Sequence, residues 1–260
     1  MAEVVIVPDA AAAGALVADA VLALVAGKPD AVLGLATGSS PLAVYAALAD
    51  RTADRGIDLS RLRGFALDEY VGLPKDHPKS YRAVITREVV EPLGLAPALV
   101  HVPGDSGPIQ TAGADYERAI TEAGGVDLQI LGIGSTGHIG FNEPGSSFGS
   151  LTRVKTLAER TRRDNARFFD SIDDVPTHCI TQGLGTIARA GHLVLLAFGE
   201  KKAETIAAAL EGPVTASMPG SAVQLHRHVT VFLDDAAASR LANADYYRYA
   251  WANRLPWETL

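Results

Sequence analysis

The sequence predicts an α/β fold: a single doubly wound domain with a central, mostly parallel sheet and helices on both faces. Short runs rich in Val, Ile and Leu alternate with Ala-rich stretches of helical length along most of the chain. Nearly continuous apolar strands separated by helices are typical of parallel βαβ units, whose strands are covered on both sides. Because the chain has 260 residues and no internal repeat or low-complexity linker, we expect one Rossmann-like domain over 1–260.

Each strand is predicted from a short apolar run. The first run is EVVIV, and VDLQILGI in the middle of the chain is the strongest. The predicted strands are 3–7, 31–36, 63–67, 126–133, 192–198 and 228–233. Because a strand buried on both faces shows no polar alternation, these runs suit a parallel sheet.

Helices are predicted between the strands, mostly from Ala-rich segments. The predicted helices are 10–27, 41–50, 80–90, 161–170, 180–188, 200–210 and 235–242. Ser40 is a good N-cap, and Pro41 suits a first helical position because the N–H that proline lacks has no partner there. The stretch 143–174 is more polar and has little strand character, so we expect an excursion or mobile flap at about 144–174.

Charge and cysteine content exclude several kinds of protein. The chain has 23 Lys and Arg against 30 Asp and Glu, a net charge of −7, whereas nucleic-acid binders need clustered positive charge. Cys179 is the only cysteine, which rules out an internal disulfide and a Cys-based zinc site. We therefore expect no nucleic-acid partner and no Cys-based metal site.

The N-terminal segment is apolar but does not fit a targeting signal. It has no basic region before its apolar run, and Glu3, Asp9 and Asp19 interrupt that run. No stretch approaches the roughly 18–20 uninterrupted apolar residues that span a bilayer. The sequence therefore predicts a cytoplasmic protein that does not bind membranes.

Three loops that follow predicted strands carry most of the candidate chemistry, because ligands of open α/β sheets gather at the carboxyl ends of the strands. In the first loop, Gly38, Ser39 and Ser40 precede a helix. Free N–H groups and the helix dipole attract phosphate there, and glycine lets the backbone approach an anion. An ordinary capped turn is the alternative, and the glycine spacings of a Walker loop or a dinucleotide fingerprint are absent.

The second loop begins with two carboxylates directly after a strand, Asp68 and Glu69. A partly desolvated carboxylate held rigidly at this position could act as a catalytic base. The alternative is a helix cap or a turn. Because the two residues are adjacent, we expect at most one of them to face a pocket.

The third loop, residues 132–144, frames one histidine with glycines at 132, 134, 137 and 140. His138 can titrate near neutral pH, and Glu143 is close enough along the chain to orient its ring or hold its charge. Asn142 adds a neutral hydrogen-bonding group. A surface loop with a solvated histidine is the alternative, but the glycine density after a buried strand favours function.

The motifs TGSSP, LDEYVGL, GSTGHIGFNEPGSS with TRVKTL, and GEKKA follow one another between about residues 31 and 233. Together they resemble the glucosamine-6-phosphate deaminase (isomerase) family. The resemblance implies conversion of D-glucosamine 6-phosphate and water into D-fructose 6-phosphate and ammonia, a step of N-acetylglucosamine catabolism, without a cofactor or a metal.

The resemblance also implies roles for individual residues. His138 would move a proton during ring opening, Glu143 would set its charge state, and Asp68 would carry a proton from C2 to C1 of the open-chain sugar. The positions matching the family's phosphate contacts are Gly38, Ser39, Ser40, Arg167 and Lys202. From the sequence alone, Arg167 does not differ from the neighbouring arginines of a solvated helix.

One position departs from the family pattern. The family commonly has Asp or Asn before the glycine–histidine pair, as part of a ring-opening relay, and this chain has Thr136. A hydroxyl can donate and accept a hydrogen bond but supplies no negative charge. We therefore expect His138 to depend more on Glu143, with ring opening slower or shifted in pH.

The resemblance further implies a homo-oligomer and an effector. Many family members are hexamers, and some are activated by N-acetylglucosamine 6-phosphate. Ser146, Arg153 and Lys155 match the residues that bind this activator, although Leu151 stands where an arginine is usual. Two exposed charges on a flap are the alternative for Arg153 and Lys155.

Two other functions compete with the deaminase. A 6-phosphogluconolactonase also has a glycine-framed histidine, but its histidine is not followed by a segment like FNEP, and lactone hydrolysis does not require Asp68. A sugar-phosphate-sensing transcription regulator would need a DNA-reading helix-turn-helix. We expect no room for one before the first predicted strand.

Overall fold

The predicted α/β fold is confirmed by the computed structural model, which describes residues 3–255 and residue 258. Seven strands, all paired in parallel, form the central sheet in the order β1-β10-β9-β6-β2-β3-β5. Their bounds are β1 Glu3–Ile6, β2 Val32–Leu35, β3 Arg63–Ala66, β5 Val100–His101, β6 Leu128–Gly132, β9 His192–Ala197 and β10 Val229–Leu233. The six predicted strands all lie in this sheet, and only the two-residue β5 was missed.

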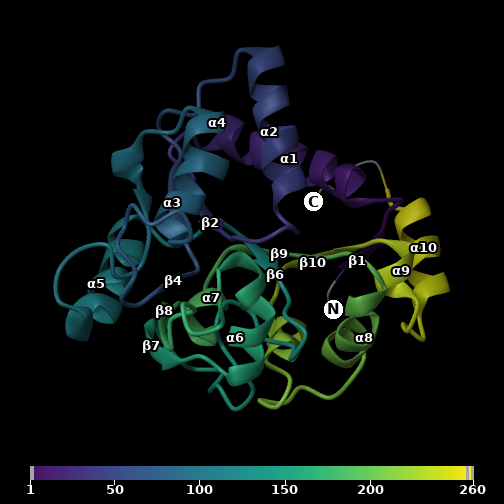
Figure 1. Ribbon diagram of the computed structural model, residues 1–260. Coiled ribbons are helices and arrows are strands. Elements are labelled where there is room, and N and C mark those ends of the chain that lie inside the picture. Colours follow the sequence, from purple (N-terminus) through teal and green to yellow (C-terminus); the bar gives the residue numbers. More distant parts are fainter. Residues whose placement is uncertain (1–2, 256–257, 259–260) are drawn as a thin grey trace.

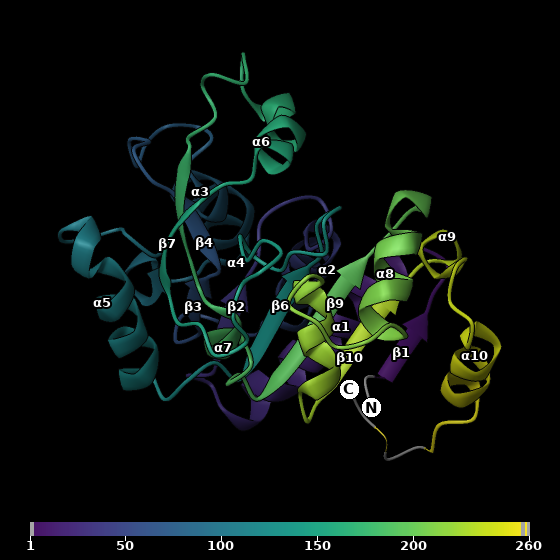
Figure 2. The ribbon, with the colours of Figure 1, turned by 90° about the horizontal axis from the view of Figure 1, so that it is seen from below.

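The central strand β6 pairs with β9 on one side and β2 on the other. Ile130 lies opposite Val194 of β9, and Leu128 lies opposite Leu33 of β2. Because all three strands run in the same direction, the loops that follow them leave the sheet at the same edge. Figure 1 looks onto this edge, and in Figure 2 the strands are seen from the side.

Helices cover both faces of the sheet. The longer ones are α1 Ala10–Gly27, α2 Leu42–Arg55, α5 Ile109–Glu122, α6 Glu159–Asn165, α8 Ala203–Leu210 and α10 Ala244–Ala252. The short helices and turns are α3 Tyr81–Ile85, η1 Thr86–Val90, α4 Glu91–Leu93, η2 Pro97–Leu99, η3 Ala166–Phe168, α7 Leu184–Ile187, η4 Glu200–Lys202, η5 Pro219–Leu225 and α9 Asp235–Ala238. α1 and α2 pack together on one face and α8 lies on the other (Figure 1).

Helix α1 shows how the apolar N-terminal segment is used. By length and composition it is the one helix among the described residues that could cross a membrane. Its side chains Val17, Val21 and Val25 are buried in the main core, and the helix packs against α2. A core helix of an α/β protein has this pattern of burial.

A second, three-stranded antiparallel sheet corrects two predictions. Its order is β4-β8-β7, with β4 Asp68–Tyr70, β7 Arg153–Thr156 and β8 His178–Thr181. The helix predicted at 180–188 is wrong at its start, because β8 pairs there with β4 and β7 and buries Cys179 and Ile180. The stretch 143–174 was expected to have little strand character, yet β7 lies within it.

Several helix boundaries also differ from the prediction. The helix predicted at 161–170 is α6, which begins at Glu159 and passes into the η3 turn, and the one predicted at 235–242 ends at Ala238. Helix α2 begins at Leu42 with Pro41 as its N-cap, and Ser40 makes no capping hydrogen bond. The hydroxyl of Ser40 is therefore not used by the helix. The predicted 80–90 helix continues through a π turn into α4 and ends at Gly94.

Candidate active site

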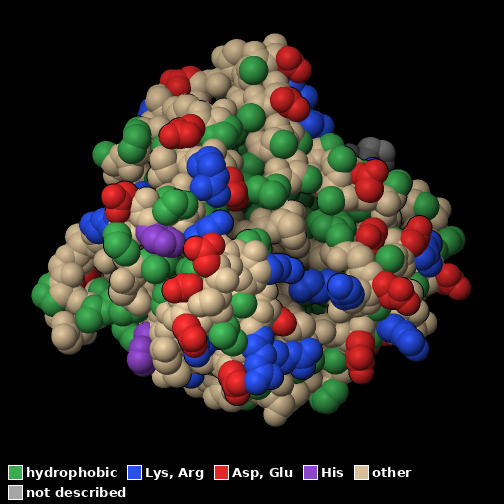
Figure 3. Space-filling model, viewed as in Figure 1, with side chains coloured by type: hydrophobic (Ala, Val, Ile, Leu, Met, Phe, Trp, Pro, Cys, Tyr) green, Lys and Arg blue, Asp and Glu red, His purple; other side chains and the backbone are tan. Residues whose placement is uncertain are grey.

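The three loops singled out in the sequence emerge at neighbouring strands. The segment 37–41 follows β2, the loop that begins at Asp68 follows β3, and the glycine-rich loop 133–144 follows β6. Lys202 lies in η4 just after β9. Since β9, β6, β2 and β3 are consecutive in the sheet, these segments meet at its carboxyl edge. On this face, Lys and Arg side chains gather beside a hollow near the centre (Figure 3).

Asp68 faces the glycine-rich loop. It is the first residue of β4, and its side chain is only 6% exposed. A methyl group added at Gly140 would lie 3.3 Å from Asp68 Oδ2 and 3.0 Å from Thr181 Oγ1. Gly140 also has φ +55°, a conformation that suits glycine. The loop that carries His138 therefore passes directly over the Asp68 carboxylate.

The surroundings of Asp68 suit a base. Burial, and secondarily the charge of the neighbouring Glu69, raises the pKa of Asp68 to about 8. Among residues 3–255 and 258, no hydrogen bond reaches its carboxylate, although its strand is fixed by pairing with β8. A carboxylate in this environment binds a proton far more readily than one in water. Removal of a proton from a carbon atom requires a base with such a high proton affinity.

Glu69 has a different role, because successive strand residues point to opposite faces. Its carboxylate accepts N–H groups from Tyr70 at 2.7 Å, Tyr81 at 2.9 Å and Arg82 at 2.8 Å. Tyr81 and Arg82 begin α3, so Glu69 caps that helix. The helix-cap alternative thus describes Glu69, and Asp68 is the member of the pair that faces the loop.

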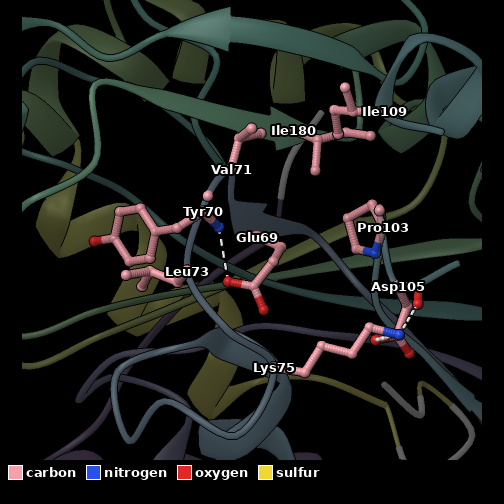
Figure 4. A pocket seen from close by; sticks show the side chains of 11 residues that line it. Glu69, Tyr70, Val71, Leu73, Lys75, Pro103, Asp105, Ile109 and Ile180 are labelled. Carbon is pink, nitrogen blue, oxygen red and sulfur yellow. Dashed lines mark hydrogen bonds and ion pairs between the residues drawn. The ribbon is translucent and has the colours of Figure 1, made fainter. Parts of the chain in front are cut away.

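A cavity of about 200 Å³ lies on the Glu69 face of β4 (Figure 4). Its lining includes Glu69, Lys75, Pro103, Asp105, Ile109 and Ile180, with Lys75 reaching across to Asp105. Asp68, His138 and Glu143 do not line it. We therefore place the candidate active site at the Asp68 face of β4 and not in this cavity.

His138 and Glu143 are joined through Thr136. The Thr136 Oγ1 atom lies 2.8 Å from His138 Nδ1 and donates to Glu143 Oε2 at 3.2 Å. The direct distance from His138 Nδ1 to Glu143 Oε2 is 3.6 Å. Because a hydroxyl has one proton, Thr136 accepts from Nδ1–H while it donates to the carboxylate. This arrangement leaves Nε2 of a neutral His138 free to accept a proton.

Glu143 is held as a carboxylate within the protein. Its side chain is 7% exposed, and Thr161 of α6 donates a hydrogen bond to its Oε1 atom. Burial by itself would raise the pKa of Glu143, but the neighbouring His138 and the hydrogen bonds from Thr161 and Thr136 keep it below the ordinary value. The histidine therefore faces a fixed negative charge. Gly134 leaves room for its ring, because a methyl group there would lie 2.1 Å from Nε2.

The cationic residues lie at the far end of the glycine-rich loop. Lys202 donates from Nζ to the carbonyl of Ile133 at 2.7 Å. Burial, and then the charge of Arg167, lowers the pKa of Lys202, so the Arg167 guanidinium lies within electrostatic range of the ammonium group. Gly38 is exposed with φ +95°, at the uncapped start of α2. Two cations and a helix N-terminus at one edge are suited to a phosphate group.

The three candidate effector residues differ in their surroundings. Arg153 is half-buried and donates to Asn142 Oδ1 at 2.9 Å and to the Leu151 carbonyl at 3.2 Å. Ser146 is buried, and no hydrogen-bond partner of its hydroxyl is found among the described residues. Lys155 is partly exposed. Arg153 thus contacts the glycine-rich loop through Asn142 and is not a freely solvated charge.

Three contacts of the site have no signal in the sequence. Thr161, Asp164 and Asn165 of α6 reach Glu143, Ser135 and Tyr70 respectively. These residues look like an ordinary polar helix surface, so only the tertiary structure identifies them. Within the part of the chain that the structure describes, no group of three or more His, Cys, Asp or Glu residues could hold a metal ion.

Known proteins are similar to this chain over most of its length. Residues 9–232 match the family described as glucosamine-6-phosphate isomerases/6-phosphogluconolactonase. A glucosamine-6-phosphate deaminase of Bifidobacterium longum is 60% identical over 268 residues, covering 99% of both chains. One of Streptomyces avermitilis is 58% identical over 258 residues, covering 98% of this chain and 99% of the other.

Two solved structures are also similar to this chain. A monomeric glucosamine-6-phosphate deaminase is 38% identical, with a TM-score of 0.88 over 92% of this chain and 99% of the other. A 6-phosphogluconolactonase from Thermotoga maritima is 20% identical, with a TM-score of 0.70 over 90% of this chain and 99% of that one, a likeness of fold alone. The chain belongs to the glucosamine-6-phosphate isomerase/6-phosphogluconolactonase family.

Proposed function

We propose that this protein is a glucosamine-6-phosphate deaminase that converts D-glucosamine 6-phosphate and water into D-fructose 6-phosphate and ammonia. The observation that carries the proposal is the buried Asp68 carboxylate facing the loop of His138, with Lys202 at the other end of that loop. Relatives 56–60% identical over nearly the whole chain and named as this enzyme support the same activity.

Ring opening is the first step. Nε2 of His138 accepts the proton of the anomeric hydroxyl, the bond between C1 and the ring oxygen breaks, and the ring oxygen receives the proton. During this transfer His138 becomes an imidazolium. Thr136 and Glu143 stabilise that charge from the Nδ1 side.

Proton transfer between C2 and C1 is the second step. Asp68 removes the proton from C2 of the open-chain aldehyde while O1 gains a proton, which gives a 2-amino enol. Asp68 then returns its proton to C1 as the amino group loses one proton. The product is an imine at C2. Water adds to C2, and the nitrogen leaves as ammonia, so one water is consumed for each ammonia released. A single base can serve both carbons because its pKa of about 8 lies near neutrality.

The phosphate is held away from the reacting carbons. Lys202 and Arg167 supply positive charge, and Gly38, Ser39 and Ser40 supply backbone and hydroxyl donors at the start of α2. Binding the phosphate at this end fixes the sugar so that C1 and C2 lie near Asp68. This positioning is the main contribution of the phosphate site to the rate.

The assembly, regulation and location of the protein are part of the same proposal. We expect a homo-oligomer in the cytoplasm, with N-acetylglucosamine 6-phosphate acting through Ser146, Arg153 and Lys155. The link from Arg153 to Asn142 supports an effect on the glycine-rich loop. One solved relative is monomeric, so light scattering with and without this effector would decide the assembly.

Ammonia release from glucosamine 6-phosphate by the purified protein tests the function directly. Two control compounds remove one requirement each, because glucosamine 1-phosphate lacks the 6-phosphate and N-acetylglucosamine 6-phosphate lacks the free amine. A third compound, 6-phosphogluconolactone, tests the lactonase alternative. Turnover of the lactone with no release of ammonia from glucosamine 6-phosphate would overturn the proposal.

A further inference from the structure

Helix α6 turns one face toward the candidate active site. Thr161 donates to Glu143, Asp164 accepts from Ser135 Oγ at 2.8 Å, and Asn165 Nδ2 donates to Tyr70 Oη at 2.9 Å. The three helix residues are spaced at i, i+3 and i+4, which places them side by side on one helix face. In Figure 2, α6 stands beyond the ends of β6 and β9. The segment that was predicted to be a flap is therefore connected to three parts of the site.

The bond between Thr161 and Glu143 is the most buried of these contacts. Thr161 is 2% exposed and Glu143 is 7% exposed. A carboxylate can only accept, so the threonine hydroxyl is the donor. Thr161 occupies Oε1, whereas Oε2 receives Thr136 and faces His138 at 3.6 Å. Each oxygen of Glu143 thus has its own hydroxyl partner, and the two partners come from different elements.

We propose that Thr161 is a positioning residue for ring opening, in a role that rests on the deaminase function proposed above. Its hydroxyl holds Glu143 in the rotamer that presents Oε2 to the Thr136–His138 pair. Because Thr161 lies on α6, this arrangement forms only while α6 is docked. Arg167 follows α6 directly in η3, so the same docking brings a phosphate-binding cation to Lys202 and a charged Glu143 to His138.

The effect of losing this hydroxyl can be derived from the groups that face Glu143. Those groups are His138 on its own loop and the buried thiol of Cys179 on β8, with Thr136 and Thr161 as hydrogen-bond donors. The charge of Asp68 on β4 raises the pKa of the same thiol. Burial raises the pKa of Cys179 so that the thiol stays neutral. Without Thr161, the Glu143 carboxylate is a buried anion with one donor fewer, and it protonates at higher pH.

The test compares Thr161→Val, which lacks the hydroxyl at nearly the same volume, with Thr161→Ser, which keeps it. We expect Thr161→Val to lower kcat about tenfold, to move the acid limb of the kcat/KM profile up by about one pH unit, and to leave KM within about threefold. Thr161→Ser should restore kcat and the position of the acid limb. Thr52→Val is the matched control, since Thr52 is also a buried threonine but bonds only backbone carbonyls within α2.

Each outcome decides between possibilities. A wild-type protein that releases no ammonia overturns the proposed function itself. An active wild type with an unchanged pH profile in folded Thr161→Val, or a Ser variant that behaves like Val, overturns only the role of Thr161. If circular dichroism shows that Thr161→Val does not fold, Thr161→Ala replaces it. Failure of both to fold would assign the residue to stability and overturn the proposal as well.

Discussion

Asp127 and Asp68 lie at opposite ends of the central sheet and have opposite surroundings. At the amino end, the partly buried Asp127 carboxylate accepts from Lys28 Nζ at 2.9 and 2.8 Å and from the Val32 N–H at 2.8 Å. His192, also at this end, bonds Thr230 Oγ1 at 2.9 Å. At the carboxyl end, Asp68 is buried without a hydrogen bond among the residues that the structure describes.

This difference separates stability from function. A buried charge that has hydrogen-bond partners costs little free energy of folding, whereas a buried charge without such partners destabilises the folded state. Asp68, at the carboxyl end, is buried without such partners, and the same burial raises its affinity for a proton. Substitutions at the two ends should therefore have opposite consequences for stability and activity.

The substitution Asp68→Asn should have the largest effect. It removes the base, so we expect ammonia release to fall by a factor of at least about 10³. Because the pKa of Asp68 is about 8 in the folded protein and 3.8 in an ordinary setting, the folded state binds this proton more tightly. The wild type thus loses stability as pH rises from about 4 to 8.

The same variant should be more stable than the wild type. An uncharged Asn avoids the cost of a buried carboxylate, so the free energy of unfolding at pH 7 should rise by about 2–4 kcal/mol. Urea unfolding at pH 5, 7 and 8 measures this, and the gain should grow with pH. An inactive variant that is also less stable at every pH would show that Asp68 supports the fold and not the chemistry.

Lys202→Met should have the next largest effect. Loss of a charged hydrogen bond to phosphate weakens binding by about 1.5–3 kcal/mol, or roughly 10- to 150-fold in kcat/KM. We expect the change mainly in KM, with weaker inhibition by inorganic phosphate. Lys201→Met is the control, because Lys201 is an exposed neighbour. Equal effects of the two substitutions would remove Lys202 from the phosphate site.

How far the sequence predicts the structure depends on how local each signal is. The strands β2, β6, β9 and β10 were predicted because each is a continuous apolar run that is buried on both faces. β8 was missed because it pairs with β4, about a hundred residues away, and β7 was missed because its partner is β8. Nothing in the local pattern of HCIT indicates that it will become the middle strand of a second sheet.

The candidate site shows the same limit. Asp68 and His138 were proposed from the sequence because carboxylates and glycines directly after buried strands are a local signal. Arg167 was separated from its neighbours only by the family resemblance, and the structure now supplies a physical difference. Arg162 donates hydrogen bonds to the carbonyls of Ile172 and Val175, whereas the positive charge of Arg167 lowers the pKa of Lys202.

Thr136→Asp tests the departure from the family pattern. A carboxylate at this position would add a negative charge beside His138 and favour its protonated form. The pH range in which His138 can accept a proton should move upward, with a change in rate of about three- to tenfold. Steady-state rates between pH 6 and 9 measure both. Identical rates and profiles for the two proteins would show that the hydroxyl relay serves as well as the charged one.

The smallest effect is expected at the amino end, from His192→Gln. Burial, and then the charges of His228 and His226, lowers the pKa of His192 to about 4 from 6.5. Its ring stacks on His228 with centroids 3.6 Å apart, so a positive charge on both rings is unfavourable. Since the unfolded chain binds this proton and the folded one does not, wild-type stability is present above pH 6.5 and falls as pH drops toward 4.

Gln keeps a hydrogen-bonding group for Thr230 but does not titrate in this range. We expect the variant to lose about 2 kcal/mol less than the wild type between pH 7 and pH 4.5 in urea unfolding, with unchanged ammonia release at pH 7.5. His178→Gln, at an exposed histidine of β8, should leave the acid dependence as it is. If His192→Gln instead altered turnover while leaving the acid dependence unchanged, the division of labour between the two ends of the sheet would be wrong, because a residue outside the catalytic edge would then control the chemistry.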